Sequence, residues 1–212
     1  MAVQVGLRER KKQQTRQQIF EAARRLFEKR GFDAVTVAEV AREADVSEVT
    51  VFNYFPTKED LFYGGMQFFE EELLEAVLSR PRGESAAKAF SRRLLASTDG
   101  LGSAERVAVI SRSARVVAAS PSLAAREREI VERYARRLGA ILAEETGSAP
   151  EDAEPLAVAW ALIAAHRTVV THVREQVRAG LHGEALVRDT RAQIRRVISR
   201  LDHGLGDYAV KA

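Results

Sequence analysis

The stretch from Thr36 to Leu61 constrains the fold of this chain more than any other part of the sequence. Thr36 is a favourable helix N-cap, and Glu39 stands three residues later, where its carboxylate completes a capping box. Asp45 marks a turn, because Asp tolerates the left-handed backbone better than most residues that carry a Cβ. Ser47 then caps a second short helix. Two short helices joined by a tight turn form a helix-turn-helix, whose second helix enters the major groove of DNA.

The second helix of this stretch has two unlike faces when each residue turns by about 100° around the axis. The residues expected to face the first helix and the core are Val46, Val51 and Phe55. The residues expected to face outward are Glu48, Val49, Phe52 and Asn53. Outward Val and Phe suit a groove lined with thymine methyl groups, while Asn53 can pair with adenine and Glu48 can accept from cytosine N4. Packing of these apolar residues against the rest of the protein is the alternative interpretation, since such patterns also occur in helical proteins that bind no DNA.

Residues at the margins of this surface predict contacts with the DNA backbone. Thr50, Tyr54 and Lys58 offer hydroxyl, phenol and ammonium groups, which commonly bind phosphates. The basic residues around the start of the first helix are Arg8, Arg10, Lys11, Lys12 and Arg16, opposed only by Glu9. Such an arm neutralises phosphates and makes binding depend on salt, and a solvated, frayed terminus is the alternative interpretation. The full set of predicted DNA-binding residues is Lys11, Arg16, Thr36, Ser47, Glu48, Val49, Thr50, Phe52, Asn53, Tyr54 and Lys58.

A wider set of residues carries a resemblance to a known family. These residues are Thr15, Arg16, Ile19, Ala22, Ala23, Leu26, Phe27, Gly31 and Phe32, then Ala44, Val46, Ser47, Thr50, Phe52, Tyr54, Phe55, Lys58, Glu59 and Leu61. Through them, residues 10–62 resemble the DNA-binding part of TetR-family (tetracycline-repressor-like) transcriptional regulators. Asp45 departs from the family pattern by replacing the turn glycine, Val49 stands where glycine is frequent, and Phe52 replaces a tyrosine. These three residues bear on which operator sequence is recognised, and they leave the expectation of DNA binding unchanged.

Composition and length limit which other classes of protein this chain can belong to. The chain has 212 residues, enough for one large or two small domains, and no cysteine, which excludes disulfides and thiolate metal sites. Its net charge of +3 is by itself weak support for nucleic-acid binding. The longest apolar run, Leu156 to Ala165, is too short to span a bilayer, and the N-terminus lacks the apolar core of a signal peptide. We therefore expect a cytoplasmic protein that does not enter a membrane.

The spacing of apolar and helix-breaking residues predicts an all-α fold of about nine helices. The expected segments are residues 10–30, the two helices of the helix-turn-helix, residues 58–79 and 84–98, a helix from residue 103, residues 120–145, a long helix ending at residue 178, and residues 184–201. We expect a helix-turn-helix DNA-binding domain over residues 10–57 and a ligand-binding and dimerisation domain over residues 58–204.

The last two expected helices carry strong apolar stripes. The resemblance implies that the corresponding helices of two subunits form a four-helix interface, here with Ile163, Val170, Val173, Ile194, Val197, Ile198 and Leu201. A homodimer is also expected on physical grounds, because one short helix contacts too few bases to be selective. Two such helices about 34–36 Å apart recognise a palindrome. Ordinary packing within one chain is the alternative use of the same stripes.

The resemblance also implies a pocket for a small-molecule effector among the helices between Lys58 and His172. The candidate lining residues are Phe62, Phe68, Phe90, Arg112, Tyr134, Trp160 and His166, for each of which core packing or solvent exposure is the alternative. The effector is expected to shift the helix that begins at Lys58, which requires different affinities for the two states. The expected protein is a repressor that its effector releases from a palindromic operator. A ligand that tightens DNA binding would have the opposite effect on repression.

Two other classes of function were weighed against a regulator. An enzyme is disfavoured because His166 and His172 are six residues apart, on opposed faces rather than at the i, i+4 spacing of a zinc motif. The sequence also contains no glycine-rich phosphate loop and no nucleophile elbow. We therefore expect no catalysis, no metal and no cofactor. A helical adaptor that keeps the helix-turn-helix only for packing predicts no salt-dependent DNA binding and no effect of replacing Lys58 or Tyr54.

Overall fold

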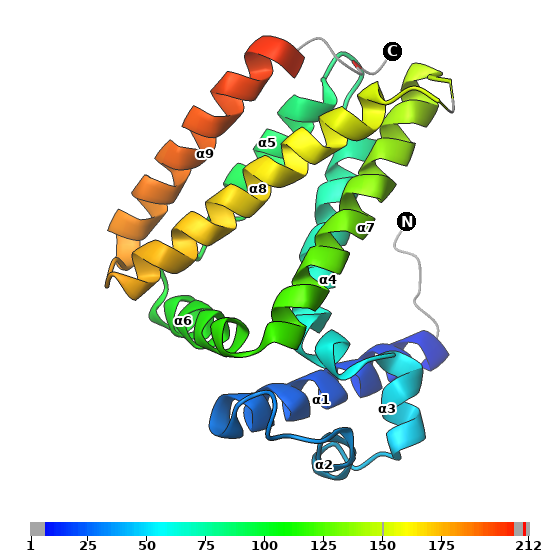
Figure 1. The fold of residues 1–212 in the computed structure, drawn as a ribbon, viewed down its shortest axis with the longest axis vertical. Coiled ribbons are helices and arrows are strands. Elements are labelled where there is room, and N and C mark those ends of the chain that lie inside the picture. Colours follow the sequence, from blue (N-terminus) through cyan, green and yellow to red (C-terminus); the bar gives the residue numbers. More distant parts are fainter. Residues whose placement is uncertain (1–6, 150, 206–209, 211–212) are drawn as a thin grey trace. The chain divides into compact units, whose positions relative to one another are not determined.

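The structure, a computed structural model, describes residues 7–149, 151–205 and 210, without the side chains of residues 7–9, 65–68 and 205. Within these residues the chain forms nine α-helices, which confirms the predicted all-α fold (Figure 1). The helices are α1 (Leu7–Arg30), α2 (Val37–Glu43), α3 (Glu48–Tyr54), α4 (Lys58–Leu78), α5 (Ala86–Ala96), α6 (Ala104–Ala119), α7 (Pro121–Thr146), α8 (Glu154–Arg178) and α9 (Gly183–Leu205).

Two helices are longer than the sequence predicts. Helix α1 begins at Leu7, three residues before its predicted start, because no glycine or proline stands there to stop it. Helix α9 continues to Leu205, four residues past its predicted end, because a glycine inside a helix such as Gly204 costs only about 1 kcal/mol relative to alanine. The sequence predicts disorder over residues 1 to about 9, which is wrong for residues 7–9 because they begin α1, and residues 1–6 lie outside the described part of the chain.

The helices fall into two compact units. The first unit comprises Met1–Phe68 with Val116–Ala124, and the second comprises Phe69–Arg115 with Ala125–Ala212. The boundary falls inside α4, α6 and α7, so each of these helices passes from one unit to the other without a loop. The sequence predicts a domain boundary between residues 57 and 58. That boundary was placed from the positions of motifs and not from contacts, and it stays a prediction.

The first unit is built around α1, against which α2 packs, with α3 packing on α2 (Figure 1). Ile19, Ala22, Ala23 and Phe27 form the buried side of α1 at the predicted helical spacing. An aromatic cluster lies beside this row, with neighbouring ring centroids 5.1–6.3 Å apart, and its members are Phe27, Phe32, Phe62 and Tyr63. This packed base fixes the helices of the helix-turn-helix.

The second unit has a hydrophobic core of its own. Helices α8 and α9 lie side by side in opposite directions, and α5 packs against both (Figure 1). Residues from all three helices meet in one buried cluster, which includes Phe90 and Leu94 from α5, Leu162 and Ile163 from α8, and Ile194 from α9. The stripes predicted on the last two helices therefore pack within a single chain.

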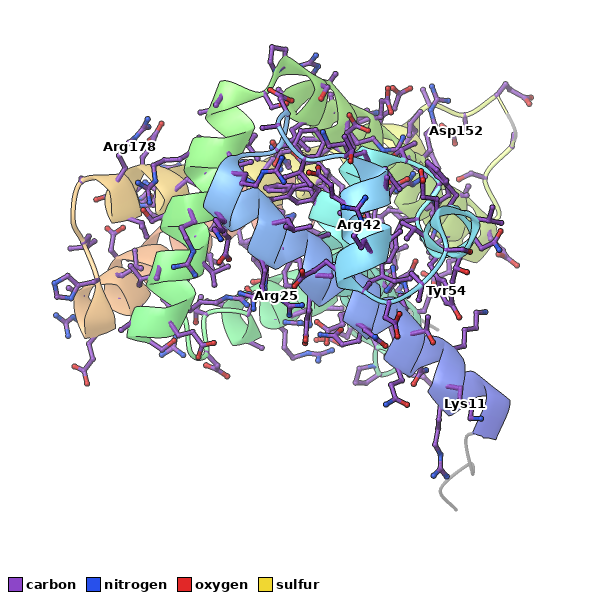
Figure 2. The ribbon with its side chains drawn as sticks, turned by 90° about the horizontal axis from the view of Figure 1, so that it is seen from below. Lys11, Arg25, Arg42, Tyr54, Asp152 and Arg178 are labelled. Atoms are coloured by element: carbon purple, nitrogen blue, oxygen red, sulfur yellow. The ribbon has the colours of Figure 1, made fainter. Side chains whose placement is uncertain are left out.

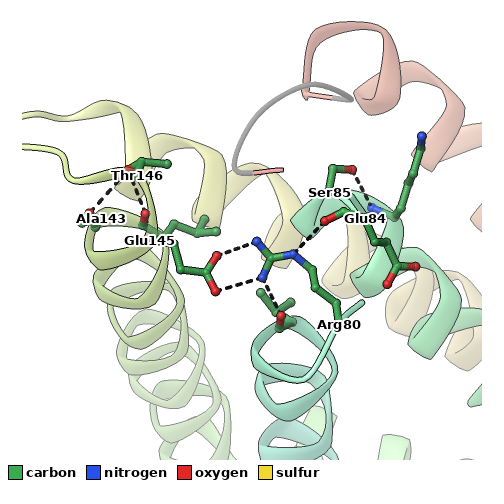
Figure 3. Close-up of polar contacts among 9 residues, drawn as sticks. Arg80, Glu84, Ser85, Ala143, Glu145 and Thr146 are labelled. Carbon is green, nitrogen blue, oxygen red and sulfur yellow. Dashed lines mark hydrogen bonds and ion pairs between the residues drawn. The ribbon is translucent and has the colours of Figure 1, made fainter. Parts of the chain in front are cut away.

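A buried arginine joins the ends of two helices in the second unit (Figure 3). The side chain of Arg80, just after α4, has no exposed surface and donates to both carboxylate oxygens of Glu145 on α7, at 3.0 and 2.5 Å. The guanidinium also donates to the carbonyls of Val77, at 2.5 Å, and Glu84, at 3.0 Å. These bonds tie the C-terminal end of α4 to α7 and to the loop before α5.

Helix α8 is long and apolar enough to cross a membrane when it is judged by length and composition alone. The sequence prediction used the shorter run from Leu156 to Ala165, which is only part of this helix. In the structure α8 buries a row of side chains in the core of the second unit, among them Val158, Val169 and Val173. Of the apolar window in α8, 39% is buried inside the structure, and one such helix is weak evidence for a membrane span.

Candidate functional site

The first helix of the helix-turn-helix, α2, is fixed at its N-terminus by a complete capping box. The backbone N–H of Glu39 donates to Thr36 Oγ1 over 3.3 Å, and the N–H of Thr36 donates to Glu39 Oε2 over 2.8 Å. Arg30, at the end of α1, contacts the other carboxylate oxygen at 2.7 Å. The bond from the Thr36 backbone, followed by that from Arg30, lowers the pKa of Glu39 to about 2. The predicted capping box is confirmed.

The turn between α2 and α3 is closed by hydrogen bonds from both sides. Asp45 adopts the predicted left-handed backbone, with φ of 51°. The N–H of Val46 then donates to the carbonyl of Ala41 over 3.0 Å. From α1, Gln18 Nε2 donates to the carbonyl of Ala44 over 2.9 Å. These contacts set the direction in which α3 leaves the turn.

Helix α3 separates a buried face from an exposed apolar face. Val51 and Phe55 are 0% and 2% exposed, whereas Val49 is 69% and Phe52 is 46% exposed. Val49 is the most exposed large apolar side chain in the described part of the chain. Glu48 and Asn53 are exposed as well, and Val46 is half-buried. The structure thus brings the four residues expected to face outward onto the solvent-accessible side of the unit.

Hydroxyl and basic residues surround α3. Ser47 caps the helix by accepting the N–H of Thr50 over 3.1 Å, as predicted, and the two hydroxyl oxygens lie 2.8 Å apart. Tyr54 is half-buried at the end of α3, and Lys11 is exposed in the N-terminal part of α1 (Figure 2). The hydroxyls of Ser47 and Thr50 share one hydrogen bond, so one of their two hydroxyl hydrogens remains to donate to an acceptor such as a phosphate oxygen.

Two of the predicted phosphate-binding cations are held by aromatic rings. The guanidinium carbon of Arg16 lies 5.1 Å from the centre of the Phe55 ring. The ammonium of Lys58 lies 4.3 Å from the centre of the Phe32 ring and 3.4 Å from the carbonyl oxygen of Asp33. Contacts between a cation and a ring face are attractive and restrict long side chains. Both cations therefore have defined positions on the first unit.

A distant segment of the chain completes this unit. Tyr63 on α4 is buried and donates its hydroxyl to the carbonyl of Leu123, in the first turn of α7, over 2.9 Å. Ser120, also buried, donates to Asp33 Oδ1 over 3.1 Å. The turn between α6 and α7 is thereby joined to α4 and to the loop after α1. Sequence reasoning missed these residues because the partners lie 60 and 87 positions apart and form no local pattern.

The residues predicted to line an effector pocket do not form a single group. Phe62 belongs to the aromatic cluster of the first unit, and the side chain of Phe68 lies outside the described residues. The others belong to the second unit, where Phe90 and Tyr134 are buried, Arg112 and His166 are half-buried, and Trp160 is 40% exposed. Their role in binding stays a prediction.

His166 stands out within this set because it packs against Phe69, an aromatic residue outside the set. Its ring centroid lies 5.2 Å from that of Phe69 on α4. Burial of the imidazole, with the positive charges of Arg167 and Arg174 as further causes, lowers the pKa of His166 to about 4. The ring is therefore uncharged at neutral pH.

Glu70 is a buried carboxyl that the sequence analysis missed. It is 6% exposed, and burial raises its pKa to about 8, although the positive charge of Arg133 opposes the shift. The group is therefore mostly protonated at pH 7. The run Glu70–Glu72 is typical of a solvated face, but Glu70 precedes Leu73 and Leu74 by three and four residues, the spacing that marks one buried side.

A second buried carboxylate of this unit is fully paired. Glu127 on α7 accepts from Arg167 at 2.7 Å and from Arg174 at 2.9 Å, both on α8. Burial alone would raise the pKa of Glu127, but the bonds from the two guanidinium groups keep it below its ordinary value. Glu127 therefore remains ionised and joins α7 to α8.

The predicted dimer-interface residues lie on α8 and α9, largely inside the chain. Ile163, Val173, Ile194 and Ile198 are buried, while Val170, Val197 and Leu201 are half-buried. The exposed side of α8 includes Ala157, Trp160 and Ala164. An interface between two copies of the chain stays a prediction.

The class of protein follows from these features together. An N-terminal helix-turn-helix with an exposed apolar reading helix, continued by three helices into an all-α unit, is the architecture of a helical transcription regulator. Residues 19–63 match the family model described as bacterial regulatory proteins of the tetR family, and residues 84–201 match that of the MftR C-terminal domain. The second match alone covers more than half of the chain. The chain belongs to the TetR family of bacterial regulatory proteins, as its sequence resemblance predicted.

Individual relatives agree with this assignment. The chain is 30% identical over 150 residues to the HTH-type transcriptional regulator TcmR of Streptomyces glaucescens, an alignment that covers 67% of this chain and 65% of TcmR. The structure of SmeT in complex with triclosan has a TM-score of 0.57 at 18% identity and covers 88% of this chain and 90% of SmeT. FadR from Bacillus subtilis, in complex with stearoyl-CoA, has a TM-score of 0.53 at 20% identity and covers 86% of this chain and 97% of FadR. These two structural matches concern the fold.

Proposed function

We propose that this protein binds a palindromic double-stranded DNA operator as a homodimer, represses transcription there, and leaves the operator when a small-molecule effector binds. The observation that carries the proposal is the exposed face of α3, where Val49 is 69% and Phe52 is 46% exposed. Large apolar side chains are unfavourable in water, and thymine methyl groups in the major groove would cover them. Glu48 and Asn53 flank them and offer groups that suit cytosine and adenine.

The groups around α3 supply the proposed contacts with phosphates. Lys11 and Arg16 on α1, and Tyr54 and Lys58 at the end of α3 and the start of α4, offer cationic or hydroxyl donors. Each phosphate that a cation neutralises releases counterions and adds about 0.9 to the slope of log affinity against log salt concentration. Binding of the operator should therefore weaken steeply as salt is added.

A homodimer follows from the small size of the reading helix. Helix α3 has seven residues and can contact only a few base pairs. Two copies related by a two-fold axis would place their α3 helices in major grooves about 34–36 Å apart. We assign the interface to α8 and α9, because Trp160, Val170 and Val197 keep apolar surface that the single chain does not bury completely.

The effector is proposed to bind in the second unit. In their structures SmeT holds triclosan and FadR holds stearoyl-CoA, and the fold of this chain is like theirs. Helices α4, α6 and α7 connect the two units without loops, so a ligand that prefers one arrangement of the second unit can bias the reading helices. A cytoplasmic location follows from DNA as the partner, and the proposal includes no catalysis and no cofactor.

The first experiment is selection of binding sites from a pool of random DNA duplexes at two salt concentrations. The proposal expects enrichment of a palindrome with two similar half-sites, and an affinity that falls steeply at the higher salt concentration. A folded protein that enriches no sequence, or that enriches a single half-site without symmetry, would contradict the proposed operator recognition.

Variants of α3 then test which surface reads the operator. Val49→Ser and Phe52→Ser should lower operator affinity, while the unfolding free energy changes by only about 0.5 kcal/mol because both side chains are exposed. Leu78→Ser is the matched control, since Leu78 is 44% exposed but lies at the far end of α4. It should change neither operator affinity nor stability. Unchanged DNA binding in both α3 variants would show that these residues serve packing instead.

A further inference from the structure

The loop between α1 and α2 holds the cation that begins α4. Lys58, the first residue of α4, donates its ammonium to the carbonyl oxygen of Asp33 over 3.4 Å. The same nitrogen lies 4.3 Å from the centre of the Phe32 ring. Phe32 and Asp33 are adjacent residues of the loop. The position of this loop therefore decides where the ammonium of Lys58 lies.

A second element, the turn between α6 and α7, fixes the same loop. Ser120 of this turn is 2% exposed and donates its hydroxyl to Asp33 Oδ1 over 3.1 Å. Asp33 thus directs its carboxylate to the turn and its backbone carbonyl to Lys58. These three residues form one continuous series of hydrogen bonds within the first unit.

Ser120 occupies a position that follows any movement of α6 and α7. Helix α6 ends at Ala119 and α7 begins at Pro121, so a single residue connects them. A connection of one residue absorbs little movement, and a change in the angle between the two helices displaces the hydroxyl of Ser120. Both helices continue into the second unit. A rearrangement there that turns either helix is therefore transmitted to Asp33 through contiguous contacts.

The same turn has a separate attachment to α4. Tyr63 donates its hydroxyl to the carbonyl of Leu123 over 2.9 Å, and this bond involves no residue of the loop after α1. The turn is thus bonded to α4 through Tyr63 and to the loop through Asp33. Each attachment can be removed by a substitution that leaves the other in place.

A lysine that is held in advance is a better phosphate ligand than a free one. A free lysine side chain loses much rotamer freedom when it binds, and a side chain that is already restricted loses less. The ammonium of Lys58 has three N–H groups, so its bond to Asp33 leaves donors for a phosphate oxygen. Its contact with the ring of Phe32 restricts it further.

We propose that Asp33 and Ser120 are positioning residues for operator binding. Ser120 holds Asp33, the loop at Asp33 holds Lys58, and Lys58 contacts a DNA phosphate. Displacement of Ser120 releases Lys58 and weakens the complex, which gives the second unit a route to the DNA besides a shift of α4. This inference rests on the proposed function, because Lys58 acts there as a phosphate contact.

The NMR signals of the lysines test the positioning step on the full-length protein without DNA. The chain has six lysines, few enough for ¹³C-labelled lysine to give resolved signals, and Lys58→Met identifies the signal that it removes. The ring of Phe32 should shift the Hε signal of Lys58 upfield in the wild type. Ser120→Ala should move that signal toward the signal of the exposed Lys11, while Tyr63→Phe should leave it in place. An unmoved signal in Ser120→Ala overturns the proposal.

The dependence of DNA affinity on salt tests the phosphate contact. Lys58→Met should lower the slope of log affinity against log salt concentration by about 0.9 for each bound subunit. Ser120→Ala changes no charge, yet it should lower the slope by at least about half as much. Tyr63→Phe is the matched control, since it removes one hydrogen bond of the same turn, and it should keep the wild-type slope.

The combination of variants shows whether Ser120 acts through Lys58. In a protein that already carries Lys58→Met, Ser120→Ala should change the slope no further. An effect of Ser120→Ala that persists without Lys58 overturns the proposal. Equal slopes in Ser120→Ala and Tyr63→Phe overturn it as well, because a general loosening of the turn would give that result.

Two substitutions of Asp33 separate its hydrogen bond from its charge. Asp33→Asn keeps an oxygen that accepts from Ser120, whereas Asp33→Ala removes it, and both variants lose one negative charge. The Ala variant should show the displaced Lys58 signal and the lower slope, and the Asn variant should show neither relative to it. Equal behaviour of the two variants overturns the role of Asp33.

The choice of DNA keeps this inference separate from the proposed function. The slopes are measured on the duplex obtained by selection and on a duplex of equal length and scrambled sequence, because phosphate contacts form on both. If the protein binds neither duplex, the proposed function fails, and the lysine signals still decide whether Ser120 positions Lys58. If it binds DNA and Ser120→Ala leaves the slope unchanged, the proposed function stands and this inference fails.

Discussion

Arg80→Met removes the buried guanidinium that joins the end of α4 to α7 (Figure 3). The wild-type side chain has no exposed surface, and it bonds the Glu145 carboxylate as well as the carbonyls of Val77 and Glu84. Breaking a buried ion pair from one side costs about 3–5 kcal/mol, because the remaining charge is left without its partner. Glu145 keeps 24% of its side chain exposed and can be hydrated, so we expect the lower end, about 3 kcal/mol.

Urea unfolding followed by the circular dichroism of the helices measures this loss. The double variant Arg80→Met with Glu145→Met replaces both charges by apolar side chains of similar length, and it should recover most of the stability, since such replacements are often nearly neutral. The costs of the two single variants should therefore sum to more than the cost of the double variant. We expect a coupling energy of about 2 kcal/mol.

Arg92→Met provides the control, because Arg92 forms a surface pair with Glu84 and its side chain is 57% exposed. Exposed pairs contribute little, so this variant should unfold close to the wild type. The reasoning is refuted if Arg80→Met lies within about 1 kcal/mol of the wild type, or if the costs at Arg80 and Glu145 simply add.

Four further outcomes can be checked in the same unfolding assay. Tyr63→Phe removes the buried hydrogen bond to Leu123 and should cost about 1 kcal/mol, so a wild-type midpoint would contradict it. Gly64→Ala places a Cβ 2.9 Å from the ring of the buried Phe55 and should cost about 1–3 kcal/mol. The stability of Glu70→Gln relative to the wild type should increase as pH rises from 4.5 to about 8 and then level off, because the unfolded chain holds fewer protons than the native state over that range. The stability of His166→Gln relative to the wild type should increase as pH falls from 6.5 to about 4. Over that range the histidine binds a proton in the unfolded chain but not in the native one.

The helix-turn-helix could be predicted residue by residue because its signals are local. The capping box of Thr36 and Glu39 and the cap from Ser47 to Thr50 both span three residues, so the residues that form each one stand close together in the sequence. Asp45 was predictable for the same reason, as a turn residue between two periodic segments. The outward direction of Val49 and Phe52 followed from helical geometry alone.

The interior of the second unit could not be predicted in this way, since burial there depends on which helices meet. The spacing of Glu70 to Leu73 and Leu74 indicates a shared helical side, but that a carboxyl on this side is buried depends on the helices that meet it. The bond from Ser120 to Asp33 joins positions 87 residues apart, and no periodicity indicates it. The start of α1 and the end of α9 were predicted too far inside these helices. No residue there prevents a helix from continuing, so the sequence does not define the ends sharply.

The first unit consists of two separate stretches of chain, and this limits how the protein can be cut and recombined. A fragment that ends at Phe68 lacks Val116–Ala124, so the buried hydroxyl of Tyr63 loses its acceptor and Asp33 loses Ser120. An N-terminal fragment therefore contains an incomplete first unit. A chimera that receives α1 to α4 from a relative must also receive the turn between α6 and α7, and an exchange with a single crossover would separate parts that fold together.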